Sequence, residues 1–320
     1  MTTHEQHDNE PYYEHQPVLL EEAVSHLVTD PSGIYIDATL GGGGHSEEIL
    51  SRLDEEGSLF GIDQDDEALE AAGRRLGSDH RFNAIKGNFG YLERLITPDL
   101  RGKISGLLLD LGVSTHQITE AERGFSFQEE GPLDMRMGNL RGVTAYEVVN
   151  EYPYKELRDV IFHYGEERKS REIARAIIEA RPVETTLQLR EIVEKLVPEK
   201  YQVKSLARVF QGIRIEVNRE LDMLRNVLKQ SLELLKPKGR VVAISYHSLE
   251  DRLVKRFFKA GNFEGKIEKD FYGNDLSPIK EISDGIITPT QEEVERNPAA
   301  RSAKMRVAEI KEKREVNNAG

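Results

Sequence analysis

The stretch from Ile34 to Ser46, IYIDATLGGGGHS, followed by LFGID at residues 59–63, decides which fold this chain adopts. Its pattern is that of a strand, a glycine turn, a helix and a second strand that ends on an acid. Consecutive glycines permit positive φ and let a ligand approach the backbone closely. Asp63 lies about 20 residues beyond the turn, where an acid can accept hydrogen bonds from a ribose. The stretch therefore predicts an adenosine-containing ligand at the edge of an α/β sheet.

The residues around the glycine turn favour one class of adenosine ligand. The dinucleotide pattern G-x-G-x-x-G is broken, because Ser46 and Glu47 stand where its last glycine would fall. No Gly-Lys-Ser/Thr follows, so the turn is not a phosphate-binding P-loop. Asp37, at the end of the first strand, would repel a pyrophosphate and attract an ammonium and a sulfonium group. These features favour S-adenosylmethionine over a nucleotide phosphate.

The rest of the chain predicts a parallel sheet that is interrupted once. A helix over residues 67–76, a strand with its exit loop over 82–89 and a strand over 104–110 continue a βαβαβ order. The next strand, 240–245, follows a turn at 236–239. So long a gap between two strands indicates an inserted domain.

The intervening segment has the apolar spacing of helices. We predict helices over 144–151, 154–164, 170–180 and 187–196, with Thr144 and Thr186 as N-caps and Glu147 completing a capping box at Thr144. An apolar stripe over 206–235 predicts one long helix that returns to the sheet. The expected fold is a doubly wound α/β sheet domain with an all-helical insert. We place the sheet domain at residues 1–120 and 215–320 and the insert at 121–214.

Composition narrows the class of protein. The chain has 320 residues, no Cys, no Trp and a formal net charge of −13. The lack of Cys excludes disulfides, thiolate zinc sites and cytosine C5 methylation through a cysteine adduct. No apolar run is long enough to span a membrane, and the acidic residues 1–14 are unlike a signal peptide. We therefore expect a soluble protein of the cytoplasm without a membrane partner.

The acidity is unevenly distributed along the chain. Residues 1–30 contain seven acids and no Lys or Arg, whereas residues 151–220 contain 14 basic and 13 acidic residues, a net charge of +1. Net charge therefore does not exclude an RNA partner, although charge runs of this kind are often solvated helix faces.

Several motifs stand out along the chain: DATLGGGGHS (37–46), GIDQD (61–65), DLGVS (110–114), RGFSF (123–127), PLDMRM (132–137), RVFQGIRI (208–215), HSLEDR (247–252) and NPAARSAKMR (297–306). Together they resemble the motifs of the bacterial 16S ribosomal RNA cytosine-N4 methyltransferases. The resemblance extends from about residue 15 to residue 310.

This resemblance implies a fold, a reaction and a set of site residues. The fold is that of a class I S-adenosylmethionine-dependent methyltransferase with a helical substrate domain. The reaction is methylation of the exocyclic N4 amine of a cytidine in the decoding region of 16S rRNA, with the small ribosomal subunit as partner. The cofactor-binding positions that it implies are Gly43, Gly44, His45, Asp63, Phe89, Asp110 and Gln117.

Methyl transfer needs alignment more than a reactive side chain, because the methyl group passes in line from sulfur to nitrogen. Hydrogen-bond acceptors near the N4 hydrogens would stabilise the positive charge that develops on the amine. Asp110 is the candidate for this catalytic role, and cofactor binding alone is an equal alternative. His45 is a candidate general base or a residue that shapes the cofactor site. We expect no metal and no covalent nucleophile.

The candidates for RNA contact lie in or near the insert. Phe125 and Phe127 are candidates to stack on an extruded nucleotide. His247 is a candidate to touch the cytosine or to cap the helix that follows it. The candidates for phosphate contacts are Arg123, Arg136, Arg208 and Arg214.

Two other functions fit parts of the pattern. An NAD-dependent oxidoreductase would also use such a sheet, but the broken dinucleotide pattern disfavours it. A ribosome assembly factor without activity could retain the fold. The sequence leaves open whether free rRNA or an assembled subunit is the substrate, and whether the chain forms a homodimer.

Overall fold

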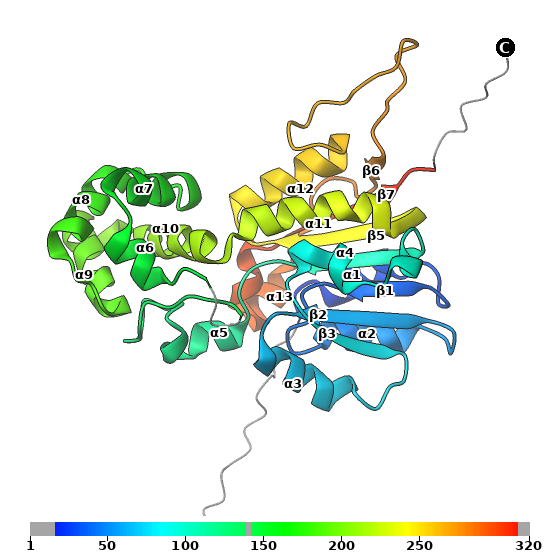
Figure 1. Cartoon of the computed structure of the whole chain (residues 1–320), viewed down its shortest axis with the longest axis horizontal. Helices are drawn as coiled ribbons and strands as arrows, with labels where there is room; N and C mark the ends of the chain where they lie inside the picture. The colour runs from blue at the N-terminus through cyan, green and yellow to red at the C-terminus, as the bar shows by residue number, and fades with distance from the viewer. Residues whose placement is uncertain (1–16, 139–141, 313–320) are drawn as a thin grey trace, which may run out of the picture.

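The computed structural model describes residues 17–138 and 142–312. Figure 1 shows a sheet covered by helices and, to one side of it, a group of helices that contains no strand of that sheet. The strands are β1 (Ile34–Asp37), β2 (Ser58–Asp63), β3 (Phe82–Lys86), β4 (Ile104–Asp110), β5 (Leu235–Ser245), β6 (Ile279–Glu281) and β7 (Lys304–Ile310).

The seven strands form one sheet in the order β3-β2-β1-β4-β5-β7-β6. Strands β1 to β5 pair in parallel, whereas β7 runs antiparallel to both β5 and β6. The predicted doubly wound α/β sheet is therefore confirmed, and four of its predicted strands, those near residues 34–37, 59–63, 82–86 and 104–110, lie where the sequence placed them.

Helices cover both faces of the sheet because both faces are apolar. Alternate side chains of one strand point to opposite faces, so Ile36 packs with α11 and α12 while Tyr35 packs with α1 and α2. The helices of this unit are α1 (Leu20–Leu27), α2 (Gly44–Arg52), α3 (Asp66–Leu76), α4 (Leu92–Leu95), α5 (Thr115–Thr119), α11 (Glu220–Leu234), α12 (Ser248–Ala260) and α13 (Gln291–Arg296).

The group of helices beside the sheet has a hydrophobic core of its own, with buried side chains drawn from residues 125–213. Thr144 caps its first helix in the predicted capping box with Glu147, and the segment predicted as the helix 154–164 ends in a π-helical turn at Val160–Tyr164. Its helices are α6 (Ala145–Glu151), α7 (Tyr154–Asp159), α8 (Ser170–Ala180), α9 (Thr186–Leu196) and α10 (Glu199–Asn218).

The prediction of one long helix over 206–235 is wrong. The helix is interrupted at Arg219, whose φ of 51° ends α10, and α11 starts at the next residue. Asn218 stabilises the break by donating to the carbonyl of Met135 at 2.8 Å and accepting from the N–H of Met137 at 2.8 Å. The apolar stripe continues through both helices, so periodicity alone does not reveal a turn that distant loop residues stabilise.

Two smaller predictions are also corrected. Thr185, not Thr186, caps α9. The buried Thr186 hydroxyl instead donates to the carbonyl of Glu129 and accepts from the N–H of Gly131. The predicted turn at 236–239 is a bulge inside β5, where the residues between Leu235 and Arg240 stand opposite a single residue of β4.

A buried ion pair joins the two helices at the break. Arg214 donates to both carboxylate oxygens of Glu220, at 2.8 and 2.9 Å, and their side chains are 15% and 9% exposed. We expect Arg214→Met to lower the free energy of unfolding by about 3–5 kcal/mol, because Glu220 would stay buried without its partner. Urea denaturation followed by circular dichroism measures this change.

The matched control is Arg225→Met, which removes an exposed ion pair with Asp222. It should change the free energy of unfolding by less than about 0.5 kcal/mol. The double variant Arg214→Met/Glu220→Leu should recover stability relative to Arg214→Met. An Arg214→Met protein as stable as the control would show that the pair does not hold the turn.

Candidate functional site

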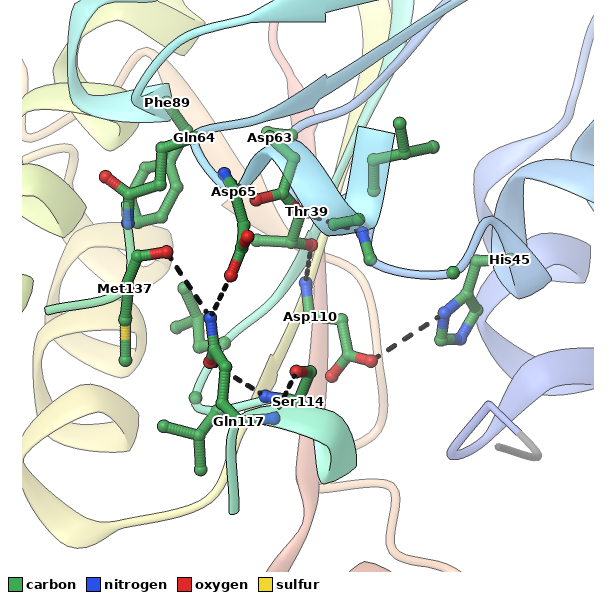
Figure 2. Close-up of a pocket in the computed structure, with 18 of the residues that line it drawn as sticks. Thr39, His45, Asp63, Gln64, Asp65, Phe89, Asp110, Ser114, Gln117 and Met137 are labelled. Carbon is green, nitrogen blue, oxygen red and sulfur yellow. Dashed lines mark hydrogen bonds and ion pairs between the residues drawn. The ribbon is translucent and has the colours of Figure 1, made fainter. Parts of the chain in front are cut away.

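A pocket opens at the carboxyl ends of β1, β2 and β4, beside the glycine turn. Parallel α/β sheets bind ligands at this edge. Figure 2 shows its side chains pointing toward a common space from the glycine turn, from the ends of the strands and from α5. Its lining includes Thr39, Gly41, Gly42, Gly44, His45, Asp63, Gln64, Asp65, Asn88, Phe89, Asp110, Leu111, Gly112, Ser114, Gln117, Met137 and Tyr246.

The glycine turn serves both the pocket and the packing of the helices. A Cβ on Gly41 would meet no atom closer than the Thr39 carbonyl at 4.0 Å, so the backbone borders open space there. Gly43, by contrast, is not among the lining residues. It caps α2 with a φ of 81°, and a Cβ there would lie 3.1 Å from Leu76 of α3. Gly43 therefore lets α2 and α3 pack, while its neighbours border the pocket.

Asp63 stands at the end of β2 and holds the glycine turn in place. Its carboxylate accepts hydrogen bonds from the N–H of Gly41 at 2.9 Å and from that of Asp65 at 3.0 Å. Burial raises its pKa, and these two donors oppose that rise. Asp63 also lines the pocket, so the carboxylate can accept from a ligand hydroxyl as well as from the turn.

Asp37 does not have the place expected from the sequence. It is 1% exposed and is absent from the pocket lining. Its carboxylate accepts from the Ser46 hydroxyl at 2.8 Å and the Thr39 N–H at 3.2 Å. Burial raises its pKa, and the nearby His45 lowers it. Asp37 thus supports the turn from beneath, and the acid that faces the pocket is Asp110.

Asp110, the last residue of β4, is a carboxylate of the pocket with a strongly raised pKa. Its N–H donates to the Thr39 hydroxyl at 2.7 Å, and its Oδ1 accepts from the Tyr246 hydroxyl at 2.8 Å. Its Oδ2 lies 3.7 Å from Nδ1 of His45 (Figure 2). Burial raises the pKa of Asp110 to about 7, although the bond from Tyr246 lowers it. Near neutral pH this carboxyl can therefore gain or lose a proton.

His45 is positioned to shape the pocket. Its Nε2 lies 3.1 Å from the carbonyl of Val18, so this nitrogen carries a proton, and in the neutral ring Nδ1 faces Asp110 without one. Burial lowers the pKa of His45, which keeps the ring neutral at pH 7. A ring held in this way donates to the segment that precedes α1 and presents an acceptor toward Asp110.

Gln117 connects the pocket to the loop that follows β4. Its side chain completes a capping box with Ser114 at the start of α5. Its Nε2 also donates to Asp65 at 3.2 Å, the contact drawn in Figure 2. The structure thus brings six of the predicted cofactor positions, all but Gly43, around one pocket. Sequence reasoning missed Asp65, Ser114 and Tyr246, although Asp65 falls within the GIDQD motif.

Comparison with known proteins bears on what this pocket is for. The model of the MraW methylase family matches residues 12–311. The chain belongs to the MraW methylase family.

Similar proteins from other bacteria are named as methyltransferases of small-subunit ribosomal RNA. The chain is 51% identical over 298 residues to the Ribosomal RNA small subunit methyltransferase H of Flavobacterium johnsoniae, a match that covers 92% of this chain and 97% of the relative. Proteins of the same name from Parabacteroides distasonis and Amoebophilus asiaticus are 48% and 50% identical over 92% of this chain and 97% and 95% of theirs. The match therefore spans both the sheet and the helices beside it.

In this methylase, the four arginines expected to contact RNA all lie close to acids. Arg123 donates to Asp65 at 2.8 Å, and Arg136 forms a bidentate pair with Asp134. Arg214 pairs with Glu220, as described above, and Arg208 lies 3.7 Å from Glu167. A phosphate would compete with these carboxylates for the guanidinium groups, and for Arg214, whose side chain is 15% exposed, a phosphate contact is not supported.

The aromatic and histidine candidates also have structural roles within the protein. Phe125 is 9% exposed and belongs to the core of the helices. Phe127 is half-buried and packs edge-on against Phe210 at a centroid distance of 5.5 Å. His247 caps α12 in a capping box with Glu250. Of the two roles considered for His247, the structure shows the cap.

One cluster of charged side chains was not foreseen. Glu220, His247 and Glu250 lie close enough to share a cation, and among the described residues they are the group with that geometry. Arg214 already pairs with Glu220 there, and His247 Nε2 lies 3.1 Å from Glu250. Both carboxylates of the cluster therefore already have partners within the protein.

A helix that crosses a membrane must span its thickness. In the part of the chain that is described, no helix is long and apolar enough to cross one.

The protonation of Asp110 predicts how the pocket responds to pH. Its pKa of about 7 means that the carboxylate is charged above neutrality and protonated below it. The affinity for S-adenosylmethionine, the cation expected from the sequence, should therefore fall about tenfold from pH 8 to pH 6, as the charged fraction falls. Isothermal titration calorimetry at a series of pH values measures this. Adenosine, which lacks the cationic end, is the control and should bind independently of pH; the same flat response for S-adenosylmethionine would contradict the prediction.

Proposed function

We propose that this protein transfers the methyl group of S-adenosylmethionine to the N4 amine of a cytidine in the decoding region of 16S rRNA. Its membership of a methylase family and the ribosomal names of its relatives support the reaction class. The observation that carries the proposal is the pocket at the carboxyl edge of the sheet. It combines a glycine turn with two carboxylates, those of Asp63 and Asp110, at the ends of β2 and β4.

The residues of the pocket suit such a cofactor. Asp63 would accept hydrogen bonds from the ribose hydroxyls, Phe89 would form an apolar wall beside the adenine, and Gly41 leaves room along the backbone. Asp110 is placed for the cationic methionine end. When bound, S-adenosylmethionine supplies an activated methyl group on a sulfonium.

The chain's own contribution to the reaction is alignment and charge. The amine gains a methyl group and must lose a proton, and an acceptor beside it stabilises the transition state. Asp110 is the candidate acceptor, because its raised pKa lets it take a proton at neutral pH. The loop from Leu111 to Ser114, which also borders the pocket, would hold the cytosine beside it.

We further propose a division of labour within the chain. Residues 1–120 and 215–320 would bind the cofactor, and the insert 121–214 would recognise the RNA of the small subunit in the cytoplasm. Several exposed cations of the insert support this role, because within the described residues they have no carboxylate within ion-pair distance: Arg168, Arg171, Arg175, Lys200 and Lys204. The ring of the exposed Tyr201 lies beside Lys200, 4.8 Å from its Nζ.

Mapping the modified base tests the proposed reaction. We expect N4-methylcytidine in the decoding region of 16S rRNA from cells that have the gene, and an unmodified cytidine at that position in cells that lack it. Mass spectrometry of nuclease fragments identifies the base. Complementation with Asp110→Asn is the control for activity: methylation restored in full would remove Asp110 from the chemistry, and unchanged methylation without the gene would contradict the function. A phenotype without any change in methylation would favour a non-catalytic assembly factor.

The cations of the insert provide a test of RNA recognition. The double variant Arg171→Glu/Lys204→Glu should weaken binding to small subunits and lower the slope of log affinity against log salt by about two, or one for each lost phosphate contact. Cofactor affinity should stay unchanged, because neither residue lines the pocket. Filter binding across a salt series measures the slope.

The matched control is Lys103→Glu/Lys238→Glu. These exposed lysines make the same change in charge, but they lie at the amino ends of β4 and β5, at the edge of the sheet opposite the pocket. The control should leave the salt slope unchanged. Equal losses in both double variants would show a general effect of net charge and no contact by the insert.

A further inference from the structure

Tyr246 follows the last residue of β5 and reaches the end of the neighbouring strand. Because β4 and β5 pair in parallel with Asp110 opposite Ile244, the side chain of Tyr246 can lie beside that carboxylate. Its hydroxyl donates to Oδ1 of Asp110 at 2.8 Å. Among the described residues, Tyr246 is the one whose side chain donates a hydrogen bond to the Asp110 carboxylate.

The ring of Tyr246 is held in place from the other side. Gly112 lies in the loop after β4 with a φ of 113°, and a Cβ there would come within 3.2 Å of the Tyr246 ring. The ring thus lies over a residue that has no side chain, and it forms one wall of the pocket. Gly112 thus lets the loop pack closely against the ring.

The other groups around Asp110 act differently on its charge. His45, on α2, faces Oδ2 at 3.7 Å with its neutral ring, and Asp37, on β1, lies behind it as a second acid. Glu250, on α12, raises the pKa of Asp110, as burial does. The bond from Tyr246 is the contact that favours the ionised form.

We propose that Tyr246 is a positioning residue that fixes the Asp110 carboxylate through Oδ1, leaves Oδ2 toward the pocket and favours the ionised form of the carboxylate. This role rests on the proposed function, since it gives Asp110 the orientation and charge needed to hold the cationic end of the cofactor and to accept from the amine. Tyr246 itself need not touch either substrate.

The test is Tyr246→Phe, which removes the hydroxyl and keeps the ring on Gly112. The pH at which S-adenosylmethionine affinity is half-maximal should rise by about one unit or more, because a hydrogen bond to a charged group favours that group by roughly tenfold or more. At pH 9, where Asp110 is ionised in either protein, the affinities should be nearly equal. The acidic limb of the methylation profile should move by the same amount.

Two further variants keep this test decisive. Tyr272→Phe removes a hydroxyl at an exposed position, 87% accessible, and should leave the midpoint unchanged. Asp110→Asn should weaken binding and abolish its dependence on pH. A pH limb that persists in Asp110→Asn would assign the titration to another group, such as His45, and would overturn the proposal.

The outcomes separate this inference from the function on which it rests. If the unaltered protein binds S-adenosylmethionine at no pH, the proposed function fails. If it binds and Tyr246→Phe leaves the midpoint in place, or lowers affinity equally at every pH, the positioning role fails while the function stands. Tyr246→Phe keeps all buried apolar contacts of the ring, so a thermal unfolding curve like that of the unaltered protein is expected.

Discussion

The parallel pairing of β1 with β2 and β4 is the constraint on which the rest of this structure depends. Parallel strands end at the same edge of a sheet, so the register of these pairs brings Asp37, Asp63 and Asp110 to one edge. Carboxylates gathered in this way repel one another and lose hydration, and the fold compensates with donors from the turn and from Tyr246. The glycine turn therefore acts as a hydrogen-bond donor to the strand ends as well as an opening for a ligand.

This arrangement leaves a site that is better suited to a cation than to an anion. Asp63 and Asp110 line the pocket with Asp65 beside them, and burial raises the pKa of the first two. A ligand with positive charge at one end would lower the electrostatic cost of ionising Asp110, whereas a phosphate would increase it. The chemistry that distinguishes a methyl donor from a dinucleotide is thus built into the strand ends, and the identity of the family agrees with it.

The helices beside the sheet are joined to it by polar contacts at a few points. Asn218 binds the loop at Met135 and Met137, Arg214 pairs with Glu220, and Glu166 accepts hydrogen bonds from α12. Each contact uses a charged or amide group that would otherwise be free to meet a ligand. Of the arginines in the sequence motifs, Arg214 takes part in these contacts, and the other three also lie close to acids. Several cations without such partners lie on exposed helix faces of the insert.

The resemblance to a known family implied seven cofactor positions, of which six line the pocket. The sequence by itself determined the α/β sheet, the positions of its first four strands and the glycine turn. These features depend on local patterns, namely alternation along strands, helical spacing and glycine at a turn, which a short window of sequence contains. Tertiary structure alone decided the break at Arg219, the withdrawal of Asp37 from the pocket and the bond between Tyr246 and Asp110. Each of these depends on residues far apart in the chain, and the free energy of such contacts comes from burial and partners that no local pattern encodes.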